Sequence, residues 1–253
     1  MSSITEPARN TITNLQIDAL KISPSDRLKS MEKPNKVIPF HTLQKKNKHS
    51  VASYFSKTIK DCLDSEMRDL IEPYATVRLT SLIRNAFSAS DQVSLNDGSS
   101  ELENFNFNTS NPFKKTINSK VYIRGGSHNG YAILHVPAFV PANELNMPEE
   151  ATNFKICARL ISISDFELSN ELKAYVPADI DSHGQLGSFE TTMLPILRMQ
   201  TQPITTQVCI NKGKALEGNV HTLLIAAVKF YCYSNGKFTH LSDHGSMKVM
   251  KVL

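Results

Sequence analysis

Tryptophan is absent from the 253 residues, and there are only four cysteines. The missing tryptophan disfavours a carbohydrate-binding surface, where an aromatic platform is expected, although seven tyrosines are present. The cysteines, Cys62, Cys157, Cys209 and Cys232, have no C-x-x-C spacing, which argues against a zinc ribbon. Three of them lie in apolar strand candidates. We therefore expect buried thiols in a reducing compartment, with two disulfides as the alternative.

Long hydrophobic runs are also missing. The longest, Leu223–Val228, is far shorter than the roughly 20 residues that cross a bilayer as a helix. Residues 1–20 lack the apolar core of a secretion signal and carry Glu6, Arg9 and Asp18. We therefore expect a cytoplasmic protein with no membrane partner.

No complete catalytic motif is present. The sequence has no G-x-S-x-G nucleophile motif. Gly125-Gly126 is not followed by a predicted helix, so it does not indicate a phosphate loop. Cys62 fits the apolar stripe of a helix and has no histidine at a motif spacing. We therefore predict that the protein is not an enzyme, and we expect no cofactor and no small-molecule substrate.

Charge is unevenly distributed along the chain. The formal net charge is +4, but residues 1–50 hold nine Lys and Arg against four Asp and Glu, whereas the remainder holds 19 against 20. Residues 1–49 are rich in Ser, Thr, Asn and Lys, and prolines interrupt them. We predict a flexible basic arm over this range. Its cluster of Lys45, Lys46 and Lys48 could contact phosphates, which makes nucleic acid an alternative partner.

A helical segment and loop are predicted over residues 50–101. Apolar residues at helical spacing predict an amphipathic helix over residues 51–63, with Ser50 as its N-cap. A second helical region follows, in which Pro73 should cause a kink or a restart. Residues 88–101 have a loop composition. The two helices form a hairpin with one apolar side.

Residues 102–253 are predicted to form an antiparallel β-sandwich, immunoglobulin-like or Greek key, so the fold class is α+β and mainly β. His221–Tyr233 is apolar on both faces, as in a central strand. Asn235-Gly236 favours a hairpin turn. The other strands are expected over Val121–Arg124 with Tyr131–Val136, over Phe154–Ile163, over Met193–Gln200 paired with Thr205–Ile210, and over Met247–Val252.

Phe139 is a candidate interaction residue. It lies in the sequence Ala138-Phe139-Val140, between Pro137 and Pro141, where a central strand is excluded because proline lacks a ladder donor. This extended apolar segment has two alternatives. It inserts into a neighbouring subunit, or it folds beneath its own sheet, which we favour.

Residues 179–190 resemble a calcium-binding loop. Asp179, Asp181, Gly184 and Glu190 occupy positions 1, 3, 6 and 12 of an EF-hand loop. His183 stands at position 5, where an oxygen ligand is needed. The candidate calcium ligands are thus Asp179, Asp181 and Glu190, and the alternative is a polar surface loop with Asp and Gly turn chemistry.

Several short segments, in order, resemble an uncharacterised family of Bacteroidetes proteins. These segments are Leu102–Asn108 with Pro112-Phe113, Val136–Pro141, Pro148–Phe154, Asp165–Glu167, Phe230-Tyr231, Asn235–Lys237 and Leu241. The resemblance covers residues 51–253 and implies an N-terminal helical region followed by a C-terminal β-domain. Members of the family have a Gly- and Arg-rich N-terminal segment, which the Ser/Thr/Asn/Lys arm replaces here. The resemblance implies no known activity.

These patterns predict a non-enzymatic structural or assembly protein. We expect it to self-associate into a homo-oligomer through sheet edges, the arm or the helical hairpin, because an unpaired strand edge is a template for further strands. Two alternatives stay open. The first is a nucleic-acid-binding module that acts through the arm, and the second is a calcium-dependent adhesion module that uses residues 179–190.

Overall fold

The computed structural model describes residues 40–86, 93–95, 99–125, 130–169, 171, 174–210 and 213–253. Residues 1–39 of the predicted arm lie outside this part. Residues 40–49 were predicted to be arm as well, and that prediction is wrong, because helix α2 (Phe40–Asp61) begins at Phe40. This stretch contains Leu, Gln and five Lys or His residues but no proline or glycine, so nothing in it opposes a helix. Ser50 therefore lies within the helix and does not cap it.

The helical region divides at Pro73 as predicted. Helix α3 (Ser65–Asp69) ends before this proline, and helix α4 (Ala75–Ala86) starts after it. Asp64 caps α3, since its side chain accepts a hydrogen bond from the backbone N–H of Met67. The described residues also include three single-turn helices and one 3₁₀ turn: α5 (Ser99–Leu102), α6 (Phe113–Thr116), α7 (Pro141–Glu144) and η3 (Ser242–His244).

Strand residues outnumber helical residues, and the strands pair antiparallel throughout. They are β1 (Tyr122–Arg124), β2 (Tyr131–Val136), β3 (Asn153–Ser164), β4 (Phe166–Ser169), β5 (Ala174–Pro177), β6 (Leu186–Glu190), β7 (Leu194–Pro195), β8 (Ile204–Cys209), β9 (Val220–Ser234), β10 (Lys237–His240) and β11 (Ser246–Val252). The fold is therefore α+β, with N-terminal helices followed by antiparallel sheets. These pairings do not confirm an immunoglobulin-like or Greek-key order.

Strand β9 is central in the main sheet, as predicted. One of its edges pairs with β3, and the other pairs with β11 and then with β10. The turn between β9 and β10 has positive φ at Asn235 (51°) and Gly236 (75°), the conformation that an Asn-Gly hairpin turn requires. Strands β6 and β7 cover the far edge of β3.

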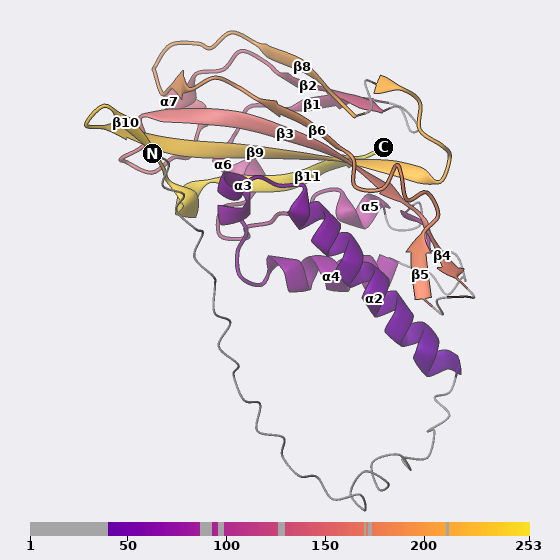
Figure 1. Ribbon diagram of the computed structural model, residues 1–253. Coiled ribbons are helices and arrows are strands. Elements are labelled where there is room, and N and C mark those ends of the chain that lie inside the picture. Colours follow the sequence, from indigo (N-terminus) through magenta and orange to yellow (C-terminus); the bar gives the residue numbers. More distant parts are fainter. Residues whose placement is uncertain are drawn as a thin grey trace, which may run out of the picture. The chain divides into compact units, whose positions relative to one another are not determined.

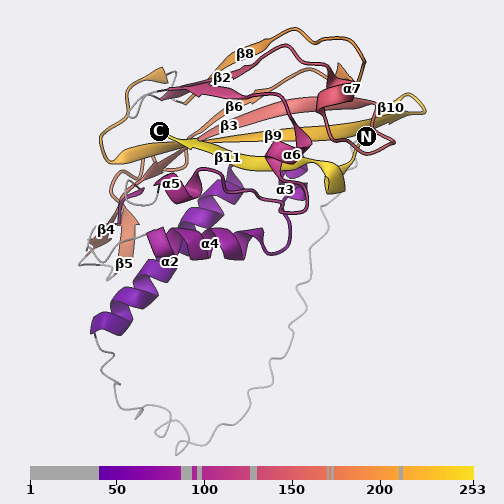
Figure 2. The ribbon, with the colours of Figure 1, turned by 180° about the vertical axis from the view of Figure 1, so that it is seen from behind.

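A second sheet, in the order β1-β2-β8, covers one face of the main sheet, and helices α2 to α5 cover the other (Figures 1 and 2). The β1-β2 hairpin was predicted. The pairing of Met193–Gln200 with Thr205–Ile210 was wrong, because β7 pairs with β3 whereas β8 pairs with β2. Residues 41–253 form one compact unit in which helices and strands share a core.

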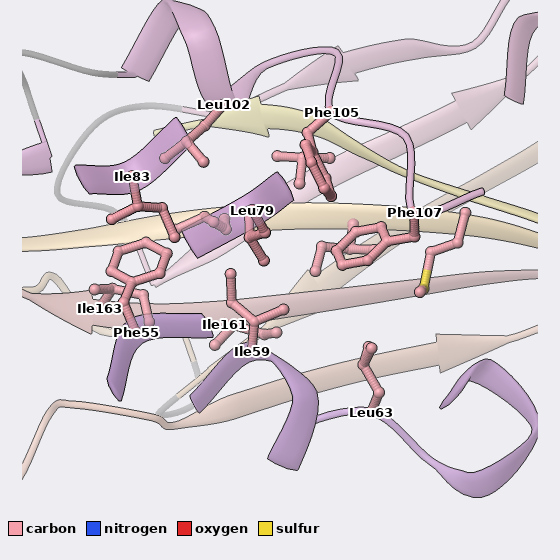
Figure 3. Packing of buried hydrophobic residues seen from close by; sticks show 14 of the residues in the cluster. Phe55, Ile59, Leu63, Leu79, Ile83, Leu102, Phe105, Phe107, Ile161 and Ile163 are labelled. Atoms are coloured by element: carbon pink, nitrogen blue, oxygen red, sulfur yellow. The ribbon is translucent and has the colours of Figure 1, made fainter. Parts of the chain in front are cut away.

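The alternating side chains of β3 and β9 supply two cores. On the helical face, Ile161 and Ile163 of β3 pack with Phe55 and Ile59 of α2 and with Leu79 of α4 (Figure 3). On the opposite face, other residues of β3 and β9 pack with the second sheet: Phe154, Ile156, Ala158, Leu160, Leu224, Ala226, Val228 and Phe230. Both faces of this strand pair are thus buried.

The two sheets approach each other closely at Gly187 of β6. A Cβ atom at this position would lie 2.3 Å from the carbonyl oxygen of Cys209 in β8, closer than real Cβ contacts. We therefore expect Gly187→Ala to lower the free energy of unfolding by about 1–3 kcal/mol, because backbone must move to admit the methyl group. Urea denaturation would measure the difference.

The neighbouring exposed residue supplies the control. Ser188→Ala alters the same strand on its exposed side and should stay within about 0.5 kcal/mol of the unmodified protein. Equal stability of the two variants would contradict the close approach of the sheets.

Candidate functional site

The predicted calcium ligands do not converge. Asp179 accepts a hydrogen bond from the N–H of Ser182 at 2.9 Å, and its bonds to Ser182 hold the pKa of its carboxyl below the usual value. Glu190 instead bonds Lys155 at 2.6 Å and Lys229 at 3.1 Å. Asp181 contributes its backbone carbonyl to a bond from Gln185. Among the described residues, no group of three or more His, Cys, Asp or Glu side chains could hold a metal ion.

The cause of this separation is the strand β6. An EF-hand continues into a helix that returns its twelfth residue to the ion, but here residues 186–190 are extended and carry Glu190 about 13 Å along the sheet. The loop itself packs on α2. The His183 ring stacks on Tyr54 with centroids 5.4 Å apart, and its Nε2 lies 3.1 Å from the Thr58 hydroxyl. Burial lowers the pKa of His183. The loop's contacts are those of a structural element.

The predicted interaction residues lie apart from one another. Lys45, Lys46 and Lys48 fall within helix α2. Phe139 is 1% exposed and packs against Phe154 with ring centroids 5.9 Å apart. The segment between the prolines therefore folds beneath its own sheet, which corrects the interaction role predicted for Phe139: it has no surface to offer a partner.

A buried charge network joins α3 to the main sheet. Lys229 of β9 is 1% exposed and donates to Glu66 at 2.7 Å and to Glu190 at 3.1 Å. Arg159 of β3 donates to the carboxylate of Asp64. Three cations, with Lys155, thus face three carboxylates.

The network satisfies its own charges. Burial raises the pKa of the Glu190 carboxyl, but the hydrogen bonds from Lys155 and Lys229 outweigh burial and leave that pKa below the usual value. Nearby, burial raises the pKa of the Cys157 thiol to about 12, so the thiol is protonated at neutral pH and is a poor nucleophile. The arrangement fits a structural role.

A different arrangement surrounds a cavity of about 420 Å³ beside α6 and β11. Figure 2 shows these two elements side by side. The cavity is lined by Phe113, Lys114, Ile117, Asn118, Ser119, Lys120, Val121, Tyr122, Lys248 and Met250. Three lysines line it, and no carboxylate does. We call it the lysine pocket.

Lys248 is the buried cation of the lysine pocket. In β11 it pairs with Ala226 of β9, so its side chain lies on the face covered by the second sheet. The residue is 5% exposed, and its Nζ donates to the side-chain oxygen of Asn104 at 2.7 Å, a neutral partner.

No carboxylate balances this charge. Within the described part of the chain, Lys114, Lys120 and Lys248 form no ion pair. Burial lowers the pKa of Lys248, and the charge of Lys114 lowers it further, while Glu103 acts in the opposite direction. The carboxylate of Glu103 lies 3.8 Å from Lys251 and accepts a bond from the N–H of Val252.

The contrast between the buried cations identifies the candidate site. Of the described Lys and Arg residues, Arg159, Lys229 and Lys248 are buried, and the first two have carboxylate partners. Buried charges in proteins are normally paired. The described residues therefore supply no anionic partner for the buried ammonium group of Lys248.

Comparisons with known proteins add no assignment: no family model, no curated protein and no solved structure matches this chain. The resemblance to the Bacteroidetes family stays a prediction.

Replacing each buried lysine by methionine would separate the two kinds of charge. Lys229→Met removes the hydrogen bonds of a buried ammonium group to Glu66 and Glu190, which are themselves 39% and 28% exposed, and we expect a loss of about 1.5–3 kcal/mol in the free energy of unfolding. Lys248→Met removes a charge that burial already disfavours, so stability should stay equal or rise. Chemical denaturation at pH 7 would measure both, and similar losses would contradict the contrast.

Proposed function

We propose that the protein is a non-enzymatic binding protein that recognises an anionic group, phosphate or carboxylate, in the lysine pocket. One observation carries this proposal: Lys248 is buried at the cavity with only the neutral Asn104 as partner. An anion there would balance the charge of Lys248, as Glu66 and Glu190 balance the charge of Lys229.

The lining supports binding of an anion over turnover. Lysine acts toward phosphate as a compact point charge with three donors. Asn118, Ser119 and Tyr122 add neutral polar groups that can orient a ligand. The lining has no carboxylate, histidine or cysteine, and we assign its lysines, Ser119 and Tyr122 to holding the anion.

Within the residues that the structure describes, no helix has both the length and the apolar character needed to cross a membrane.

Calorimetric titration with inorganic phosphate, and separately with citrate, would test the site. Lys248→Met should weaken binding about 10-fold or more, because a hydrogen bond to a charged group contributes about 1.5–3 kcal/mol. Lys115→Met is the matched control, since Lys115 lies on α6 beside Lys114 but does not line the pocket. Absence of binding, or equal loss in both variants, would refute the proposal.

Binding should also depend on pH. The pKa of Lys248 is lowered, so this lysine loses its charge at a lower pH than an exposed lysine does. Affinity should therefore fall as pH rises through that lowered pKa, and an anion, which favours the charged form, should cause proton uptake in this range. Titrations in buffers of different ionisation enthalpy would detect the uptake. A pH-independent affinity would contradict the role of Lys248.

Self-association is a second candidate, favoured by the β9–β10 hairpin. Among the described strands, β10 pairs only with β9. Tyr233 and Phe238 stack on this hairpin with centroids 4.7 Å apart, and each is about half exposed at 51% and 47%. The edge of β11 is less available, because residues 104–107 cover it with backbone hydrogen bonds to Met247 and Val249. A second copy would add to β10.

Light scattering over a range of concentrations would test self-association. We expect the mass of the full chain to rise above the monomer, and Phe238→Lys to reverse this by placing a charge on the exposed aromatic pair. Tyr74→Lys changes an even more exposed aromatic residue, 75% exposed, outside the hairpin and should have no effect. A monomer at all concentrations would reject this second function.

A further inference from the structure

A second cavity adjoins the lysine pocket. Its volume is about 610 Å³, and it is lined by Tyr122, Ile123, Arg124, Ile133, His135 and Thr205. Tyr122 lines both cavities. We call the second one the β1 groove, because its lining starts on β1 and continues across β2 to β8.

The strand register explains the composition of the groove. Tyr122 pairs with His135, Arg124 pairs with Ile133, and His135 pairs with Thr205. Paired residues lie on the same face of a sheet, and this face is opposite to the one that buries Leu134. The groove therefore lies on the outer face of the second sheet, with Ile123, which pairs with Leu134, contributing from the buried side.

Its chemistry combines an aromatic surface with positive charge. Tyr122 is 49% exposed, and its ring is tilted at 35° to that of His135, with centroids 6.0 Å apart. The hydroxyl of Thr205, 2.7 Å from Nδ1, fixes the His135 ring. Arg124 is exposed and forms no ion pair with another described residue. Flat aromatic ligands stack on such surfaces.

The chain sets the spacing between the two cavities. Tyr122 and Arg124 alternate along β1 and so lie about 7 Å apart, and Lys120 is two residues before Tyr122, a step that spans at most about 7 Å. Lys120 can contact an anion in the lysine pocket, and two residues later the exposed ring of Tyr122 can contact an aromatic group. This spacing suits a ligand whose anionic group and ring are joined by a short linker.

We propose that the ligand is a nucleotide, with its phosphate in the lysine pocket and its base on Tyr122 in the β1 groove. This inference rests on the proposed function, because it uses the same lysines for the phosphate. Stacking on an aromatic side chain accepts any base, since every base has a π-face. The same chemistry is offered by a free nucleotide and by one unit of a single-stranded chain.

Binding of adenosine 5′-monophosphate, ribose 5-phosphate, adenosine and a single-stranded trinucleotide would be compared by calorimetry. We expect the monophosphate or the trinucleotide to bind about 10-fold tighter than ribose 5-phosphate, and adenosine to bind weakest. The better of the two nucleotide ligands identifies the source. Tyr122→Leu should remove the advantage over ribose 5-phosphate, whereas Tyr122→Phe, which keeps the ring, should retain it.

Tyr74→Leu, at an exposed tyrosine outside the groove, should change nothing, and thermal melts confirm that each variant folds. Equal affinity for the monophosphate, the trinucleotide and ribose 5-phosphate, unaffected by Tyr122→Leu, would overturn this inference and leave anion recognition intact. No binding of any phosphate would overturn both proposals. Loss of nucleotide binding in Tyr122→Phe as well would also overturn the stacking role.

Discussion

The antiparallel pair of β3 and β9, buried on both faces, is the constraint on which the rest of the structure depends. All twelve residues of β3 pair with β9, and successive side chains must point to opposite faces. Each face therefore requires its own cover, which helices α2 to α5 supply on one side and the second sheet, with α6, on the other. A strand pair of this kind has little place for an unpaired charge, because water is excluded from both sides.

The charges that do occur near this pair separate into two classes. Lys229 and Arg159 face carboxylates from α3 and β6, so their burial fixes the position of the short helix that caps the sheet. Lys248 lies one strand further out, beside α6, and meets only an amide oxygen. The rule that buried charges are paired thus explains why α3 is held against the sheet. It also shows that the lysine pocket lacks one partner, an anion for Lys248.

Local patterns predicted the parts of the fold that depend on local sequence. The apolar run of β9, the Asn235-Gly236 turn and the restart of the helix after Pro73 were all predicted correctly. The partner of β8 was not, because strands adjacent in sequence need not pair, and β8 joins β2 across some 70 residues. Glu190 shows the same limit, since a correct loop spacing does not say whether a helix or a strand follows. The lysine pocket was only weakly indicated by the sequence. The alternation in Ser246–Val252 places Lys248 on the same face of the strand as Ser246 and Met250. Whether that face is buried depends on residues 113–122, which are distant in sequence.

The unpaired Lys248 is also a local inconsistency in a chain whose other described buried Lys and Arg residues are balanced, and such inconsistencies concentrate at functional positions. Two features make it tolerable without a ligand: the cavity of about 420 Å³ that it lines is large enough to hold water, and Asn104 accepts a hydrogen bond from the ammonium group. Neither supplies an opposite charge. An anion would therefore strengthen the folded state more than either, since a ligand that binds only the folded protein stabilises it by mass action. A lysine that served only for packing would gain nothing from its charge, whereas a lysine that binds an anion must be charged. Lys114 and Lys120 are exposed at the same cavity, so an anion could enter from their side.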